Sequence, residues 1–128
     1  MRRALLASAA LGLLSIGATV SCGGSSGGGG GGQPAGSIKV DMTEFKFDPS
    51  TPSAPAGKVT FYLVNSGSVA HDLVLESPDG KKMAASELVQ PGNTSVFTVN
   101  NLSAGTYPFI CDQPGHEASG MKGTFTVT

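Results

Sequence analysis

Short apolar segments, separated by glycine and proline, follow one another from Ile38 to the end of the chain. They are rich in valine, phenylalanine, threonine and tyrosine, which favour strands, and short strands with turns at this spacing are typical of a sandwich or a barrel. The longest segment, Val59–Val64, is apolar, aromatic or β-branched at every position, which predicts a strand packed on both sides or lying at a sheet crossing. We therefore expect an all-β fold with a single domain.

The pattern fits roughly six to eight short strands. The segment Lys81–Val89 has no clear alternation, and we expect it to be irregular with a short helical turn. The expected strands are Ile38–Met42 continuing into Glu44–Phe47, Lys58–Asn65, Ala70–Glu76, Thr94–Val99, Gly105–Cys111 and Met121–Val127.

Residues 1–22 have the pattern of a secretory signal peptide. Arg2 and Arg3 precede an apolar run from Ala4 to Val20, which is shorter than a typical transmembrane helix. The alternative is an uncleaved membrane anchor. Both interpretations place the domain outside the cytoplasm, in the periplasm or at the outer face of the cell membrane.

The cysteine at the end of this region resembles the lipobox of bacterial lipoproteins, in which the cysteine becomes the lipidated first residue. Cys22 follows Val20 and Ser21 and precedes a glycine, as in that pattern, whereas Thr19 stands where those proteins usually have an aliphatic residue. The resemblance implies that Cys22 attaches the protein to a membrane. Ordinary cleavage nearby, which would leave Cys22 unmodified, is the alternative.

Residues 23–36 are almost entirely glycine and serine, so they cannot bury enough apolar surface to order themselves. We expect a flexible linker there and a folded domain over residues 37–128. Without residues 1–21 the formal net charge changes from −1 to −3, because six lysines then face nine acidic residues. A mildly acidic domain argues against binding to nucleic acid. We expect it to be a monomer.

Cys111 is the only cysteine of the expected domain, because Cys22 lies in the signal region. It has no partner for an internal disulfide. A lone thiol in an oxidising compartment is a liability unless it is buried, binds a metal or acts as a nucleophile. These three roles remain open at this point.

Strand alternation places three potential ligands on inward faces, each at the end of its strand. A single inward histidine or cysteine is more often structural than functional. His71 shares a face with Leu73 and Leu75, opposite Asp72 and Glu76; Cys111 shares one with Tyr107 and Phe109; and Met121 shares one with Phe125 and Val127.

The four residues are more informative as a set. His116 follows Cys111 by five positions, Met121 follows His116 by five more, and His71 is the other histidine of the chain. Thiolate and thioether sulfur suit copper, imidazole suits both of its oxidation states, and a trigonal His, His, Cys plane with a weak axial Met limits rearrangement between Cu(I) and Cu(II). The set therefore predicts one type 1 copper ion at His71, Cys111, His116 and Met121, suited to fast electron transfer.

Residues 37–128 also resemble the cupredoxins, the type 1 blue copper family of plastocyanin and azurin. The resemblance rests on Gly105–His116, on Gly120–Gly123 and on Asn65–His71. The four-residue gaps on both sides of His116 are most similar to auracyanin and rusticyanin. The resemblance implies a Greek-key β-sandwich and a small extracytoplasmic carrier of single electrons. It also implies transient docking of redox partner proteins near His116.

One position departs from that pattern. Many relatives have asparagine after the first histidine, and here the residue is Asp72. A carboxylate near Cys111 would affect the redox potential and its pH dependence. The outward parity of Asp72 suggests instead that it caps the neighbouring loop.

Three other functions fit the sequence less well than electron transfer does. A copper-binding module for storage, delivery or sensing usually has clustered Met or His residues, and no such cluster occurs. An enzyme with Cys111 as nucleophile and His71 or His116 as base leaves Met121 unexplained. A metal-free scaffold is disfavoured because all four ligand positions are filled. We therefore expect an electron carrier and not an enzyme.

Overall fold

The computed structural model describes residues 32–128, and strands are the only regular elements in this part of the chain. The predicted signal peptide (1–22), Cys22 and most of the predicted linker (23–36) lie outside the described residues. Within 32–128 there is no helix capable of crossing a membrane. The strands are β1 (Ile38–Thr43), β2 (Lys46–Asp48), β3 (Ser53–Ala54), β4 (Gly57–Asn65), β5 (Val74–Glu76), β6 (Lys82–Ala85), β7 (Thr94–Leu102), β8 (Gly105–Ile110) and β9 (Lys122–Val127).

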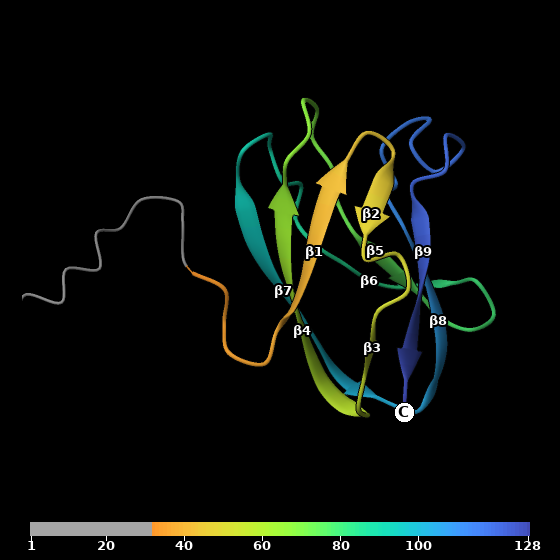
Figure 1. Cartoon of the computed structure of the whole chain (residues 1–128). Coiled ribbons are helices and arrows are strands. Elements are labelled where there is room, and N and C mark those ends of the chain that lie inside the picture. The colour runs from red at the N-terminus through yellow and green to blue at the C-terminus, as the bar shows by residue number, and fades with distance from the viewer. Residues whose placement is uncertain (1–31) are drawn as a thin grey trace, which may run out of the picture.

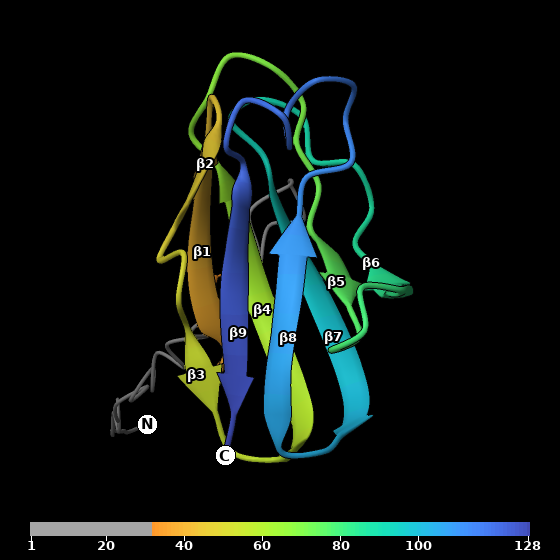
Figure 2. The ribbon, with the colours of Figure 1, turned by 90° about the vertical axis from the view of Figure 1, so that its right-hand side faces the viewer.

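These strands form two sheets packed face to face, as Figures 1 and 2 show from two sides. The first sheet has the order β2-β1-β4-β7 and the second the order β3-β9-β8-β5-β6. Most neighbours are antiparallel, but β1 pairs with β4 and β3 pairs with β9 in parallel. The all-β, single-domain sandwich predicted from the sequence is therefore confirmed. It has more strands than expected in residues 32–128 because β3 and β6 were not predicted and because the expected opening strand, Ile38–Met42 continuing into Glu44–Phe47, is the antiparallel hairpin of β1 and β2. The expected strand Ala70–Glu76 is shorter than predicted, since β5 begins only at Val74.

Strand β4 shows how the core is built. Its burial alternates, with Val59, Phe61 and Leu63 buried against the second sheet and the residues between them half-buried. The prediction that this strand packs on both sides is wrong. Because β4 lies between β1 and β7, neighbouring side chains cover part of its outer face without a further layer. Phe61 meets Phe125 of β9 edge to face, with ring centroids 5.1 Å apart.

The expected irregular segment after β5 instead contains β6. Val74 pairs with Ala85 and Leu75 with Ala84, so β6 occupies the free edge of β5 opposite β8. The predicted helical turn is wrong, because pairing with an available edge outweighs the weak local preference of this sequence for any one structure.

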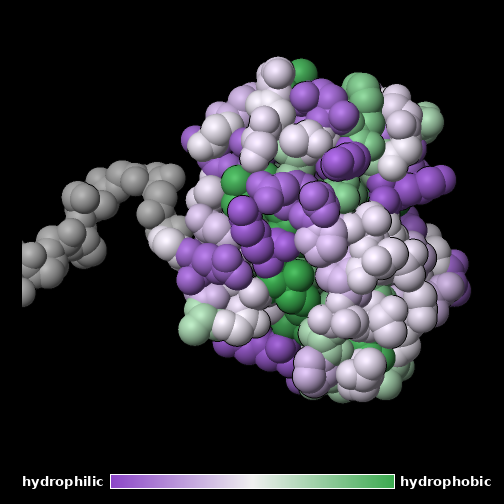
Figure 3. Space-filling model, in the orientation of Figure 1, coloured by the Kyte–Doolittle hydropathy of each residue, from purple (hydrophilic) through white to green (hydrophobic). Residues whose placement is uncertain are grey.

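Four connections gather at the end of the sandwich opposite the C-terminus: the turn after β1 and the loops after β4, β6 and β8 (Figures 1 and 2). On the face shown in Figure 3, hydrophilic and intermediate residues cover most of the surface, and apolar atoms are limited to a narrow central strip and small patches. The residues of the candidate site described below lie among these four connections.

Candidate metal centre

His71, Cys111 and His116 come together at that end of the sandwich. One ligand atom from each lies within 4.8 Å of the others. His71 lies in the β4–β5 loop, Cys111 directly follows β8, and His116 lies in the loop between β8 and β9. His71 and Cys111 are fully buried, and His116 is partly exposed. The inward positions expected for His71 and Cys111 therefore agree with their burial.

The three atoms have the spacing of a metal site. His71 Nδ1 lies 3.2 Å from His116 Nδ1 and 3.9 Å from Cys111 Sγ, and His116 Nδ1 lies 3.4 Å from Cys111 Sγ. A point in their plane is about 2 Å from all three, which is close to metal–ligand bonding distance. One thiolate and two imidazoles at this separation form a donor set suited to a transition metal.

Backbone hydrogen bonds shape the loop that carries two of these residues. The Cys111 N–H donates to the Met121 carbonyl at 3.1 Å, and the Met121 N–H donates to the His116 carbonyl at 3.0 Å. The His116 N–H in turn donates to Gln113 O at 3.0 Å. Met121 is fully buried in the core, immediately before β9. The fourth predicted residue thus closes the loop through its backbone and points its side chain inward.

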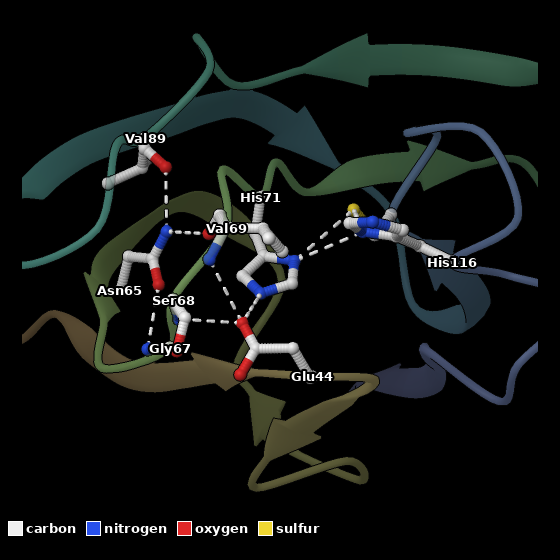
Figure 4. A network of polar contacts seen from close by, with 9 residues as sticks. Glu44, Asn65, Gly67, Ser68, Val69, His71, Val89 and His116 are labelled. Atoms are coloured by element: carbon white, nitrogen blue, oxygen red, sulfur yellow. Dashed lines mark hydrogen bonds and ion pairs between the residues drawn. The ribbon is translucent and has the colours of Figure 1, made fainter.

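His71 is fixed by its own backbone and by a neighbouring amide. It exchanges two backbone hydrogen bonds with Val89, at 2.8 and 3.1 Å. The buried Asn65 side chain donates to Val69 O and Val89 O, both at 2.8 Å, and accepts the Gly67 N–H. Asn65 therefore joins the loop before His71 to the loop after β6, as seen in Figure 4.

Burial raises the pKa of the Cys111 thiol to about 11, and backbone N–H groups of Asp72 and Gln113 act in the opposite direction. A thiol with this pKa is protonated and a poor nucleophile near neutral pH. A bound metal cation deprotonates a coordinating thiol outright. The surroundings of Cys111 therefore favour a metal ligand over a catalytic nucleophile.

Asp72 caps the loop after Cys111. Its Oδ1 accepts the Asp112 N–H at 2.9 Å, and its Oδ2 accepts from Gln113 Nε2 at 3.2 Å. The expectation of a capping role is confirmed, but the outward position is not, because the capped loop covers Asp72 and leaves it 7% exposed. Burial, and secondarily contact with the Asp112 carboxyl, raises the pKa of Asp72.

Glu44, in the turn between β1 and β2, was not predicted as a site residue. Its Oε1 lies 3.2 Å from His71 Nε2 and accepts the backbone N–H groups of Ser68 and Val69 at 2.7 and 3.1 Å. The Ser68 hydrogen bond is the main cause that lowers the pKa of Glu44. The sequence could not predict this contact, because strand alternation does not show which loop the β1–β2 turn will pack against.

One apolar side chain, Phe45, contacts the partly exposed His116. The Phe45 ring meets its imidazole edge to face with centroids 5.0 Å apart. Phe45, Val69 and Leu88 are exposed by 39%, 42% and 45%, and they come from three different connections at this end. We call these three residues the apolar rim.

Comparison with known proteins gives the family. The family model of the cupredoxin-like domain matches residues 12–127. The chain is 38% identical over 60 residues to auracyanin B of Chloroflexus aurantiacus, covering 46% of this chain but only 26% of that protein. It is 28% identical over 97 residues to plastocyanin of Scenedesmus fuscus, covering 70% of this chain and 94% of that protein. It is also 28% identical over 108 residues to the copper-resistant cuproprotein CopI of Rubrivivax gelatinosus, covering 71% of this chain and 66% of that protein.

Comparison with solved structures also finds auracyanin. The reduced auracyanin of Roseiflexus castenholzii superposes with a TM-score of 0.65 at 23% identity, over 75% of this chain and 99% of that chain. At this identity the likeness concerns the fold alone. Because the family model spans most of the sequence, this chain belongs to the cupredoxin-like family.

Proposed function

We propose that this chain is a small extracytoplasmic blue copper protein that carries single electrons between redox partners. One type 1 copper ion would be held by His71, Cys111, His116 and Met121. The observation that carries the proposal is the spacing of two imidazole nitrogens and one thiol sulfur about 2 Å from a common point.

Copper held by these residues would supply one-electron chemistry, by cycling between Cu(II) and Cu(I) as partners donate and accept electrons. The protein's part is to keep the ligands in place in both states. His71 is held by Val89 and Glu44, and Cys111 by the Met121 carbonyl. Ligands fixed in this way limit rearrangement during electron transfer.

Electrons would enter and leave through His116. Its imidazole is the ligand that reaches the surface, and the exposed side chains of the apolar rim, Phe45, Val69 and Leu88, belong to connections at the same end of the molecule. Small apolar surfaces suit transient redox partners, which bury little area and separate quickly. We place the docking surface of the partner there, with the carrier acting as a monomer.

The N-terminal pattern supports a membrane-bound location. We propose that residues 1–22 direct export, that lipidated Cys22 anchors the protein, and that residues 23–36 tether the domain of residues 37–128 at the periplasmic or outer face of the membrane.

A copper-binding module for storage, delivery or sensing is the second candidate, and similarity to the copper-resistant cuproprotein CopI favours it. Delivery and sensing need a site that releases or exposes its metal. Two fully buried ligands and a loop closed by its own backbone bonds favour retention instead.

The test is to load the purified protein with Cu(II) and record visible absorption and electron paramagnetic resonance before and after ascorbate. We expect an intense blue or green band that ascorbate bleaches and an oxidant restores, with slow loss of copper to a chelator. Cys111→Ser should abolish the band, while Met121→Leu should keep it and shift the potential. A colourless copper complex that passes its metal rapidly to the chelator would favour the second candidate.

A further inference from the structure

We propose that Glu44 is a positioning residue for the ligand His71. Its carboxylate holds the buried imidazole with the proton on Nε2 and the lone pair of Nδ1 toward the metal, and its charge favours Cu(II) over Cu(I). The inference rests on the proposed copper site and goes beyond it, because it assigns a role to a residue outside the ligand set.

The two ring nitrogens of His71 face different partners. Nδ1 lies 3.2 Å from His116 Nδ1 and 3.9 Å from Cys111 Sγ, whereas Nε2 lies 3.2 Å from Glu44 Oε1. Figure 4 shows His116 and Glu44 beside different nitrogens of the ring. A neutral imidazole has one N–H and one lone pair, and an ionised carboxylate can only accept hydrogen bonds. The proton of a neutral His71 therefore belongs on Nε2, which leaves Nδ1 free to bind a metal.

Glu44 is itself held in place. It accepts two backbone N–H groups, from Ser68 and Val69, in the loop that leads to His71. Both bonds end on Oε1, the same oxygen that lies 3.2 Å from His71 Nε2. One carboxylate oxygen thus ties the β1–β2 turn to the β4–β5 loop and to the buried ligand.

Gly67 makes room for this arrangement. A Cβ at position 67 would overlap Glu44 Oε1 and come within 3.1 Å of Oε2. The backbone of Gly67 does not have the positive φ that would exclude other residues. An alanine there would displace the carboxylate while leaving the charge of the protein unchanged.

The charge of Glu44 acts on the site without a competing cation. Among residues 32–128, His71 is the only basic side chain within ion-pair distance of this carboxylate. A carboxylate hydrogen-bonded to one nitrogen of an imidazole makes the other nitrogen a stronger electron-pair donor to a metal. A stronger electron-pair donor and a nearby negative charge both stabilise Cu(II) more than Cu(I). Glu44 therefore lowers the reduction potential of the copper site.

The first test is voltammetry on copper-loaded variants. Glu44→Gln keeps the size and an oxygen acceptor but removes the charge, and we expect a higher potential with the blue band retained, together with about 10- to 100-fold weaker Cu(II) binding. Gly67→Ala should raise the potential without a change in net charge. Asp48→Asn, which removes an exposed carboxylate from the same hairpin, is the control and should leave both quantities close to wild type.

The second test needs no copper. Nitrogen-15 NMR of the metal-free protein at mildly alkaline pH should find the His71 proton on Nε2, and Glu44→Ala should give a mixture of the two tautomers. A wild-type proton on Nδ1, or potentials for Glu44→Gln and Gly67→Ala equal to wild type, would overturn the proposal. If the protein formed no blue copper site, the proposed function would fail, but the tautomer measurement would still decide the role of Glu44.

Discussion

The two histidines of the site differ in how the protein holds them. His71 is fully buried, with two backbone hydrogen bonds to Val89 and a carboxylate on its Nε2. His116 sits in a loop, reaches the surface and meets Phe45 edge to face. The His71 ring has polar neighbours at both of its nitrogens and its backbone is paired with Val89, whereas His116 is held mainly by the backbone hydrogen bonds of its own loop. The first therefore provides rigidity and the second provides access.

The largest expected difference between them is in rescue by free imidazole. In His116→Gly the vacated position opens to solvent, so added imidazole should restore the blue band of the copper-loaded protein. In His71→Gly the vacated position is sealed, and the same concentration should restore little or no band. Titration followed by visible absorption measures both. Equal rescue of the two variants would remove the distinction between a sealed and an open ligand.

The second difference concerns the stability of the metal-free protein. His71→Ala removes a fully buried ring and one of the three hydrogen-bond partners of Glu44 Oε1, which should lower the free energy of unfolding by about 1–3 kcal/mol. His116→Ala removes a partly exposed ring and should change it by no more than about 0.5 kcal/mol. Urea denaturation followed by circular dichroism gives both values. The comparison fails if His116→Ala is the more damaging substitution.

The third prediction sharpens the access role of His116. Leu88→Lys places an ammonium group in the apolar rim, where burying it under a partner costs desolvation energy. Electron transfer from a soluble cytochrome should slow by about tenfold, equivalent to roughly 1.4 kcal/mol. The reduction potential should not change. Val96→Lys is the matched control, because Val96 is an exposed apolar residue of β7 outside the rim, and it should transfer electrons at the wild-type rate.

The smallest expected effect is on how the stability of the metal-free protein depends on pH in the acid range. The pKa of Glu44 is lowered from its ordinary value of 4.5, so its contribution to stability is present above that value and is lost as the pH falls through the lower pKa of the folded state. Metal-free Glu44→Gln should therefore lose less stability than wild type on acidification, as measured by thermal unfolding. His116→Ala should keep the wild-type acid dependence, since His116 does not contact Glu44.

Much of the site could be predicted from strand alternation. The alternation of the expected strands places His71, Cys111 and Met121 inward, and all three are fully buried, although each lies outside the strands of the structure. His116 could be found only from its spacing and from the family resemblance, because it lies in a loop without strand periodicity. Their roles as ligands remain predictions until copper is added.

The remainder depended on which segments meet in space. Asp72 has outward parity, yet the loop after Cys111 folds over it. Strand β6 exists because β5 offers a free edge, which no local pattern shows. Glu44 contacts His71 across 27 positions of sequence, and only the packing of the β1–β2 turn against the β4–β5 loop brings them together. The predicted signal peptide, linker and lipidated Cys22 still rest on sequence alone.

The missing side chain at position 67 has a consequence for how this protein can evolve. Because a Cβ there would occupy the space of the Glu44 carboxylate, selection cannot act on the two positions separately. A lineage that gains any side chain at position 67 loses the benefit of an acid at position 44, and a lineage that loses the acid is released from glycine. Among descendants of this sequence, the two residues should be inherited or lost together.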